Sequence, residues 1–269
     1  MIHVLTVHWK DPMWIDIQLA YLKTHINAEF KVYAFLNDIP TEYNSKFFYT
    51  STENIIEHSI KLNILADIAI FNSENDSDIL LFIDGDAFPI APLDKYIDQG
   101  IKNSQLIAIQ RKENNGDIQP HPCFCATTVG FWKKIQGDWN EGYKWKDSNN
   151  NLITDVGGNL LEKLNNKNIS WKKILRSNTL STHPLWFGVY DNIIYHHGSG
   201  FREPVSREDS KLLRSVFRSL IPKAIQNKLK QNIFAKKAFR VINSSEKMKK
   251  ISNDIYEEIK TNTNFYKKL

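Results

Sequence analysis

The first half of the chain alternates short, mostly apolar runs with longer segments in which apolar residues recur at helical spacing. Residues 2–7, 30–36 and 79–83 are the apolar runs, and each has the length and the aliphatic or aromatic content of a strand. Residues 15–26 and 58–71 have the helical spacing. Because strands that alternate with helices form parallel sheets covered by helices, this pattern predicts a Rossmann-like β-α-β-α-β unit of the α/β class.

The pattern over the second half of the chain predicts further strands, which should make the sheet mixed, with parallel and antiparallel neighbours. Residues 106–110 and 123–132 are further strand candidates, and the polar loop 111–122 between them is expected near the rim of a site. Residues 154–164 are typical of a loop that leads into a helix, and residues 190–197 form the last predicted strand. The expected sheet is therefore mostly parallel, with helices on both faces.

Composition and charge divide the chain in two. With 269 residues, 42% hydrophobic and 24% charged, it can bury a core of its own. Residues 206–269 contain 16 Lys and Arg against 6 Asp and Glu, a net charge of +10, whereas residues 1–205 carry −5. The shift predicts a main domain over 1–205 and a basic helical extension over 206–269.

The basic extension contains an amphipathic pattern over residues 211–223, where apolar and basic side chains recur at helical spacing. Such a helix can lie on an anionic membrane surface, here through residues 206–240, or it can pack its apolar side on the main domain or on a second subunit. No apolar run approaches the roughly 18 residues of a membrane span, and no signal peptide is evident at the start. We therefore expect a cytoplasmic protein, with peripheral attachment to the inner face of the cytoplasmic membrane as one use of the helix.

Two carboxylates follow the apolar run 79–83 directly. Asp84 and Asp86 are separated by Gly85, which allows a tight turn between them. In open α/β sheets the ligand crevice lies outside the carboxyl ends of the strands, and carboxylate oxygens suit Mg²⁺ or Mn²⁺. An acidic turn after a strand is common without a metal, so the motif needs support from other segments.

Three segments together resemble the signature of GT-A fold nucleotide-sugar glycosyltransferases, including glycogenin-like enzymes and transferases of bacterial surface glycans. They are Phe82 to Ile90 with its D-x-D motif, Thr154 to Leu161 with an acidic residue before a helix, and Tyr195 to Pro204 with its histidines. The resemblance covers about residues 1–205. It implies a GT-A catalytic domain there, with a mixed, mostly parallel sheet flanked by helices.

The resemblance also implies a metal site that holds a nucleoside-diphosphate sugar. Asp86 would ligate Mn²⁺ or Mg²⁺, and Asp84 would contact the ribose or the metal and its water shell. The ion would bridge the diphosphate and stabilise the leaving nucleoside diphosphate as a Lewis acid.

A histidine near the end of the main domain would complete the metal site. His196 and His197 point to opposite sides of a strand, so only one can face the metal. The order from His197 to Pro204 resembles the H-x-x-G-x-x-K-P motif and favours His197. The motif has a lysine that contacts the diphosphate at the position where this chain has Glu203. The neighbouring Arg202 would supply the positive charge in its place.

Further donor contacts follow from the same resemblance. Gly198 and Gly200 would let the backbone approach phosphate oxygens. Four more residues lie at the end of the first strand and on the helix before the acidic motif, where relatives contact the nucleotide: Thr6, His8, Lys61 and Asn63. A solvated helix face would explain the last two as well.

Asp155 is the candidate on the acceptor side. In inverting GT-A enzymes a carboxylate in this region takes the proton from the attacking hydroxyl, and in retaining relatives a residue here binds sugar hydroxyls. Gly157 and Gly158 after it leave space for a sugar ring. The alternative is that Thr154 or Asp155 only caps the following helix.

The predicted function is a metal-dependent glycosyltransferase that moves a sugar from a nucleoside-diphosphate donor to a glycan or lipid-linked glycan, in bacterial surface polysaccharide synthesis. A nucleotidyltransferase or sugar-nucleotide pyrophosphorylase would share the sheet and the acidic site, but no Gly-rich basic phosphate loop follows the first strand. A noncatalytic glycan- or membrane-binding protein would use the aromatic residues and the basic tail. No nucleic-acid partner is expected, because the main domain is acidic.

Overall fold

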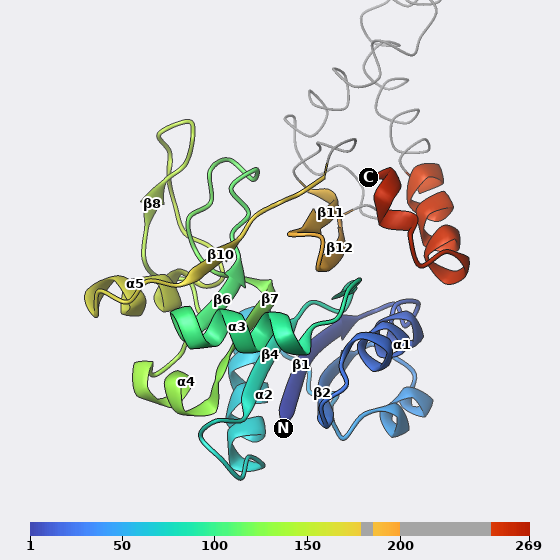
Figure 1. Cartoon of the computed structure of the whole chain (residues 1–269), viewed down its shortest axis with the longest axis horizontal. Helices are drawn as coiled ribbons and strands as arrows, with labels where there is room; N and C mark the ends of the chain where they lie inside the picture. The colour runs from blue at the N-terminus through green and yellow to red at the C-terminus, as the bar shows by residue number, and fades with distance from the viewer. Residues whose placement is uncertain (179–184, 200–248) are drawn as a thin grey trace, which may run out of the picture.

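In the computed structural model, residues 1–178, 185–199 and 249–269 are described. They form a central seven-stranded sheet in the order β10-β6-β7-β4-β1-β2-β3 (Figure 1). Its strands are β1 (Ile2–Trp9), β2 (Phe30–Asn37), β3 (Tyr49–Ser51), β4 (Ile79–Ile83), β6 (Leu106–Ile109), β7 (His121–Thr128) and β10 (Lys172–Ile174). Of these strands, β7 alone runs against its neighbours. The predicted fold class, a mixed and mostly parallel α/β sheet, is confirmed.

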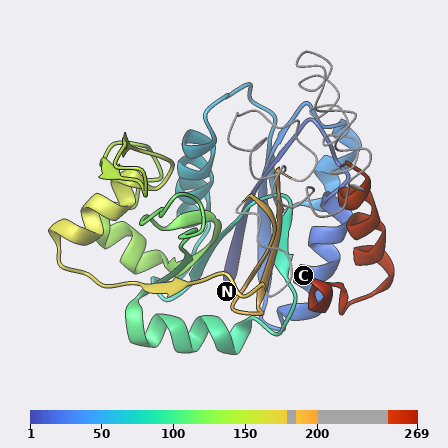
Figure 2. The same ribbon diagram turned by 90° about the horizontal axis from the view of Figure 1, so that it is seen from above.

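Helices cover both faces of this sheet. The α-helices are α1 (Ile15–His25), α2 (His58–Phe71), α3 (Asp94–Ser104), α4 (Val129–Ile135) and α5 (Gly158–Asn166), and a 3₁₀ turn spans Thr41–Lys46. Alternate residues of the strands pack against α2, α4 and α5 on one face and against α1 and α3 on the other. Figure 2 shows the sheet edge-on between these layers. Because both faces are covered, the central strands are mostly apolar rather than alternating, and the polar side chains of β1, such as His3 and Thr6, are buried with them.

A second, antiparallel sheet stands at the carboxyl edge of β4. It consists of β11 (Trp186–Tyr190), β12 (Ile194–Gly198) and β5 (Ala87–Pro89), in that order. β5 follows β4 after the Asp84–Asp86 turn, and β12 pairs with it so that His196 lies opposite Ala87. A separate two-stranded hairpin joins β8 (Trp145–Lys146) and β9 (Leu152–Ile153).

The described C-terminal residues pack on the main domain. Residues 249–261 are helical, and a 3₁₀ turn follows at Phe265–Lys268. The Tyr21 hydroxyl donates to the Ile259 carbonyl at 3.0 Å, and the Tyr256 hydroxyl donates to the Met13 carbonyl at 3.0 Å. Phe265 is buried in the same aromatic cluster as Tyr21. This end of the predicted extension is therefore part of the packed body.

The amphipathic helix predicted over residues 211–223 lies outside the described residues. Gly200 and Arg202 lie outside them too. None of the helices in the described part has both the length and the apolar character that a membrane span requires.

The strand predicted over residues 123–132 is wrong in its second half. β7 ends at Thr128, and the chain then turns into α4. The Thr128 hydroxyl accepts a hydrogen bond from the Phe131 backbone N–H at 3.1 Å, as an N-cap does. Val129, Trp132 and other apolar residues of α4 are buried at helical spacing, which a continuous apolar run conceals.

The single strand predicted over residues 190–197 is also wrong, because it is a hairpin. Tyr190 ends β11, and β12 begins at Ile194. Asp191 and Asn192 have φ of 49° and 53°, and the Ile193 N–H donates to the Tyr190 carbonyl at 2.9 Å. Two successive left-handed residues match a tight hairpin turn, for which Asp and Asn are favoured.

The N-cap at Thr128 can be tested by mutation, because it sets the boundary between β7 and α4. Replacing Thr128 by Ala removes the side-chain acceptor and should lower the free energy of unfolding by about 1 kcal/mol. Thr128→Ser keeps the hydroxyl and should recover most of that loss, as measured by urea unfolding. Equal losses in the two variants would show that the cap does not stabilise this helix.

Candidate active site

A cleft of about 920 Å³ opens at the carboxyl ends of β1 and β4. The chain passes from β1 through α1 to β2 on one side, and α2 then leads back to β4 on the other side of β1. The connections therefore diverge between β1 and β4, which is the point where open α/β sheets bind ligands. Residues from the ends of both strands line the cleft, and β11, β12 and the loop before β7 close its other side.

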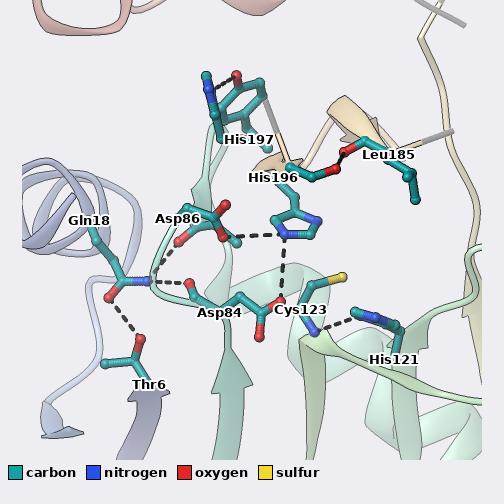
Figure 3. A network of polar contacts seen from close by, with 12 residues as sticks. Thr6, Gln18, Asp84, Asp86, His121, Cys123, Leu185, His196 and His197 are labelled. Atoms are coloured by element: carbon teal, nitrogen blue, oxygen red, sulfur yellow. Dashed lines mark hydrogen bonds and ion pairs between the residues drawn. The ribbon is translucent and has the colours of Figure 1, made fainter. Parts of the chain in front are cut away.

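Buried hydrogen bonds hold the Asp84–Asp86 turn in place. The Gln18 amide on α1 donates to the carbonyls of Asp84 at 2.7 Å and Ala87 at 2.8 Å. The Thr6 hydroxyl donates in turn to the Gln18 amide oxygen at 3.1 Å (Figure 3). Thr6 is fully buried and lies behind the cleft. Thr6 was predicted to contact the donor. In the structure it instead holds Gln18, which in turn holds the acidic turn.

Gly85 is required by the close packing of this turn against β1. A Cβ at this position would lie 2.5 Å from the Val7 carbonyl oxygen and 2.7 Å from Nδ1 of His8. Contacts this short do not occur for real side chains, so only glycine lets both neighbouring carboxylates reach the cleft.

The carboxylates meet a histidine from β12. His196 Nε2 lies 3.3 Å from Oδ1 of Asp86 and 3.6 Å from Oδ2 of Asp84. One ligand atom from each of the three residues lies within 4.8 Å of the others, and Figure 3 shows the three side chains converging. His58, at the start of α2, adds Nε2 at 3.2 Å from Oδ1 of Asp84. The two carboxylates suit Mn²⁺ or Mg²⁺, and the imidazole of His196 offers a third, nitrogen ligand.

Electrostatic pairing keeps this cluster ionised despite its burial. Burial raises the pKa of Asp84, but the neighbouring histidines, His58 first and then His196 and His121, outweigh it and hold that pKa well below the ordinary range. Burial similarly opposes the charge of His196, yet Asp86 raises the pKa of His196 well above its ordinary value. A divalent cation between the carboxylates would replace the charge that the histidines supply.

The structure brings His196, and not the predicted His197, to the carboxylates. His197 points to the other side of β12, where its Nδ1 lies 2.9 Å from the Tyr195 hydroxyl. Its ring packs against Trp14 and Phe187, with centroids 4.7 Å and 4.9 Å away. Burial lowers the pKa of His197 to about 3. Strand alternation allows only one of the two histidines to face the carboxylates. The spacing of the motif favoured His197, and the structure places His196 there.

The remaining donor candidates separate into two groups. His8 and Lys61 line the cleft, and Gly198 lines it with φ of 67°. Burial lowers the pKa of His8 to about 4. Asn63 is turned away, because its amide donates to Asp138 at 2.8 Å and accepts from the Trp139 backbone N–H at 2.9 Å. The structure thus shows a structural role for Asn63.

Lys61 is a cation enclosed by the cleft wall. It is 4% exposed, and its ammonium makes no ion pair or hydrogen bond within the described residues. Burial lowers its pKa. The charges of Glu57 and Asp38 oppose this shift in part, and an anionic ligand in the cleft would stabilise the ammonium further.

Asp155 lines the cleft from the loop before α5. Its Oδ1 accepts from the Val156 backbone N–H at 2.8 Å. The following helix is preceded by Gly157 with φ of 92°, and no side chain caps it. The Thr154 hydroxyl instead accepts from the Gly142 N–H at 3.0 Å. The capping alternative therefore does not explain Asp155.

Three cleft residues were missed by the sequence analysis: His58, Arg111 and His121. Arg111 and His121 stand at the two ends of the polar loop that was expected near a rim, and Arg111 Nη1 lies 3.1 Å from His121 Nε2. His58 was predicted to begin a helix and is the first residue of α2, but nothing in the sequence indicates that it faces the acidic turn. Among the tryptophans, Trp186 lines the cleft, whereas Trp139 is fully buried in the core.

Among known proteins, the chain is similar to solved structures but matches no protein-family model and no curated protein. It is similar to S. aureus TarS 1–349, at 12% identity and a TM-score of 0.42 over 98% of this chain and 88% of that one. A second neighbour is the galactosyltransferase LgtC in complex with donor and acceptor sugar analogs, at 10% identity and 0.41 over 84% and 99%. A third is the glycosyltransferase GlyE of Streptococcus pneumoniae TIGR4, at 15% identity and 0.37 over 50% and 36%.

Glycosyltransferases are thus among the solved structures to which this chain is similar. All three TM-scores lie below 0.5. The function of the chain has to follow from its own residues.

The cluster predicts a Mn²⁺ site that distinguishes the two histidines. Mn²⁺ affinity, measured by electron paramagnetic resonance of the free ion, should fall at least about tenfold in Asp86→Asn and in His196→Ala, because each loses a ligand. His197→Phe keeps the aromatic packing and should bind normally, as should Asp98→Asn on the exposed surface of α3. Loss of binding in His197→Phe with retention in His196→Ala would reverse the assignment.

Proposed function

We propose that this chain is a metal-dependent glycosyltransferase that moves a sugar from a nucleoside-diphosphate donor to a glycan acceptor. The observation that carries the proposal is the convergence of Asp84, Asp86 and His196 at the point where the sheet connections diverge. The cleft around them has a volume of about 920 Å³, which lies within the range of sites for ligands of nucleotide-sugar size.

The residues of the cleft divide into a donor side and an acceptor side. His8 and Lys61 lie toward β1 and α2, where a nucleotide at the divergence of the strands would place its ribose and phosphates. Lys61 would neutralise phosphate charge. Mn²⁺ or Mg²⁺ held by the Asp84, Asp86 and His196 side chains would supply Lewis-acid stabilisation of the leaving diphosphate.

Asp155 would act on the acceptor from the loop before α5. In an inverting reaction its carboxylate would accept the proton of the attacking hydroxyl, and in a retaining reaction it would bind sugar hydroxyls. Trp186 and Trp9 line the same cleft, and Trp9 is 58% exposed. Their rings offer flat apolar surfaces for a sugar or a base.

The acceptor is a glycan, including a lipid-linked one, and the predicted setting is bacterial surface polysaccharide synthesis in the cytoplasm. A helix over residues 206–240 at an anionic membrane surface would suit a lipid-linked acceptor. That helix lies outside the described residues, so the membrane contact stays a prediction from the sequence, as does the division of the chain at residue 205.

Nucleotide binding tests the proposal most directly. Isothermal titration of UDP, GDP, CDP and dTDP should show one nucleotide that binds in the presence of Mn²⁺, because the ion bridges the carboxylates to the diphosphate. Asp86→Asn should lose this binding by at least about tenfold, and Asp98→Asn should keep it.

Two other outcomes would replace the proposal. Binding of none of the four nucleotides with Mn²⁺ present would favour a noncatalytic glycan- or membrane-binding protein. Release of pyrophosphate from a nucleoside triphosphate and a sugar phosphate would identify a sugar-nucleotide pyrophosphorylase.

Lys61 offers a test in which stability and binding change in opposite directions. Lys61→Met removes a buried charge without an anionic partner, so the midpoint of thermal unfolding should rise in the absence of ligand. The affinity for the nucleotide should fall about tenfold, equivalent to about 1.4 kcal/mol. Lys23→Met, on the exposed side of α1, is the control and should change neither. A lower midpoint with unchanged affinity would assign Lys61 a structural role.

A further inference from the structure

The Arg111 guanidinium lines the cleft with most of its hydrogen-bonding capacity unused. Within the described residues its side chain makes one polar contact, the 3.1 Å approach of Nη1 to His121 Nε2. Its Nε is shut off from solvent and has no acceptor. No described carboxylate lies within ion-pair distance of it. A guanidinium has five N–H donors and is always charged, so this group lacks an anion.

The position of the proton on the His121 ring determines whether a donor or an acceptor faces this guanidinium. Its Nδ1 accepts a hydrogen bond from the Cys123 backbone N–H at 3.1 Å. Both neighbours of the ring can only donate, and a neutral imidazole has one lone pair. The subsite requires this lone pair on Nδ1, facing the Cys123 N–H, and the ring proton on Nε2. Burial, followed by the charge of Arg111, lowers the pKa of His121 well below its ordinary value, which agrees with a neutral ring.

Two donors therefore point at each other. In this tautomer the His121 Nε2–H faces the Arg111 Nη1–H across 3.1 Å, and within the described residues neither group donates to an acceptor of the chain. Leaving such donors unsatisfied is unfavourable, and more so for a charged group. An oxyanion in the cleft would accept from both groups, and the planar guanidinium matches the two oxygens of a carboxylate or phosphate.

We propose that Arg111 and His121 form an oxyanion-binding subsite of the cleft, and that it takes an acidic group carried by the acceptor. The subsite lies at the β7 side of the Asp84 cluster, with the His121 and His196 rings 6.4 Å apart. Asp155 and Pro122 line the same cleft. His8 and Lys61 belong to the β1 and α2 side. The assignment to the acceptor rests on the proposed function, whereas the anion subsite itself does not.

The ligand chemistry is a phosphate or a carboxylate attached to a sugar. Both accept from a guanidinium and an imidazole N–H, and both would place a charge beside the reacting hydroxyl. A neutral sugar would leave the donor pair unsatisfied. The acceptor would then be an acidic glycan, either phosphorylated or built with a uronic acid.

The tautomer of His121 tests the premise on the unmodified protein. Long-range ¹H–¹⁵N spectra of imidazole-labelled, metal-free protein should show His121 as the Nε2–H tautomer. The Nε2–H signal should shift in a saturable way with inorganic phosphate or acetate at constant ionic strength. An Nδ1–H tautomer would let His121 accept from Arg111 and would overturn the proposal, as would the absence of a saturable shift with either anion.

A variant and its matched control locate the effect. Arg111→Gln should weaken the anion affinity at least about tenfold, since it removes the charge and the paired donors. Lys112→Gln removes a neighbouring charge from an exposed position of the same loop and should keep the affinity. Equal loss in both variants would indicate a diffuse effect of positive charge and would contradict a built subsite. Circular dichroism confirms that each variant is folded.

Sugar probes distinguish the two sources of the anion and the two sides of the cleft. Glucuronic acid, glucose 6-phosphate and glucose should be titrated against the His121 signal, and glucose should give no shift. The charged sugar with the higher affinity names the group. If UDP with Mn²⁺ produces the phosphate-type shift at His121, the subsite belongs to the donor and the acceptor assignment is wrong. These titrations need no transfer reaction, so their failure is distinct from failure of the proposed function.

Discussion

The pairing of β5 with β12 is the constraint on which the site depends. The acidic turn leads directly from β4 into β5, and the ladder sets His196 opposite Ala87, one residue after Asp86. The backbone hydrogen bonds between β5 and β12 therefore hold His196 beside the carboxylates, so its position does not depend on a flexible loop. A shift of this register by one residue would turn His197 toward the carboxylates and His196 away from them.

The two sides of β12 serve different purposes. His196 faces the carboxylates, whereas Tyr195 and His197 face an aromatic cluster that includes Trp14. Tyr256 packs edge-on against Trp14, with ring centroids 5.1 Å apart. The described C-terminal residues thus cover the back of the strand that carries the histidine, and burial of aromatic surface supports the geometry of the polar side.

Charge is arranged unevenly in the cleft. His58 and His196 lie within ion-pair distance of Asp84 and Asp86, and the pKa of His196 is raised by Asp86, so the carboxylates have partners within the chain. Lys61 on one side and Arg111 on the other have no carboxylate partner among the described residues. Enclosed cations without partners lower the stability of the folded chain, and sites keep such residues where a ligand supplies the missing charge.

Much of the fold followed from local patterns. The alternation of apolar runs and helical spacing over residues 2–83 predicted the β-α-β-α-β unit, because each element there has a single clear period. The pattern failed over residues 123–132 and 190–197, where apolar residues run across a cap or a turn. In those places Thr128 and the Asp191–Asn192 pair set the boundary, and such signals are short and easily hidden in an apolar run.

The sequence by itself determined that a buried strand ends in Asp84 and Asp86, and that one of two adjacent histidines belongs near them. It also placed His8, Lys61 and Asp155 as site candidates, and all three line the cleft. The tertiary structure decided between His196 and His197, turned Thr6 and Asn63 toward structural partners, and added His58, Arg111 and His121. Strand register and the packing of distant segments fix which side of an element faces the cleft. No local pattern in the sequence contains that information, because it arises from contacts between residues far apart along the chain.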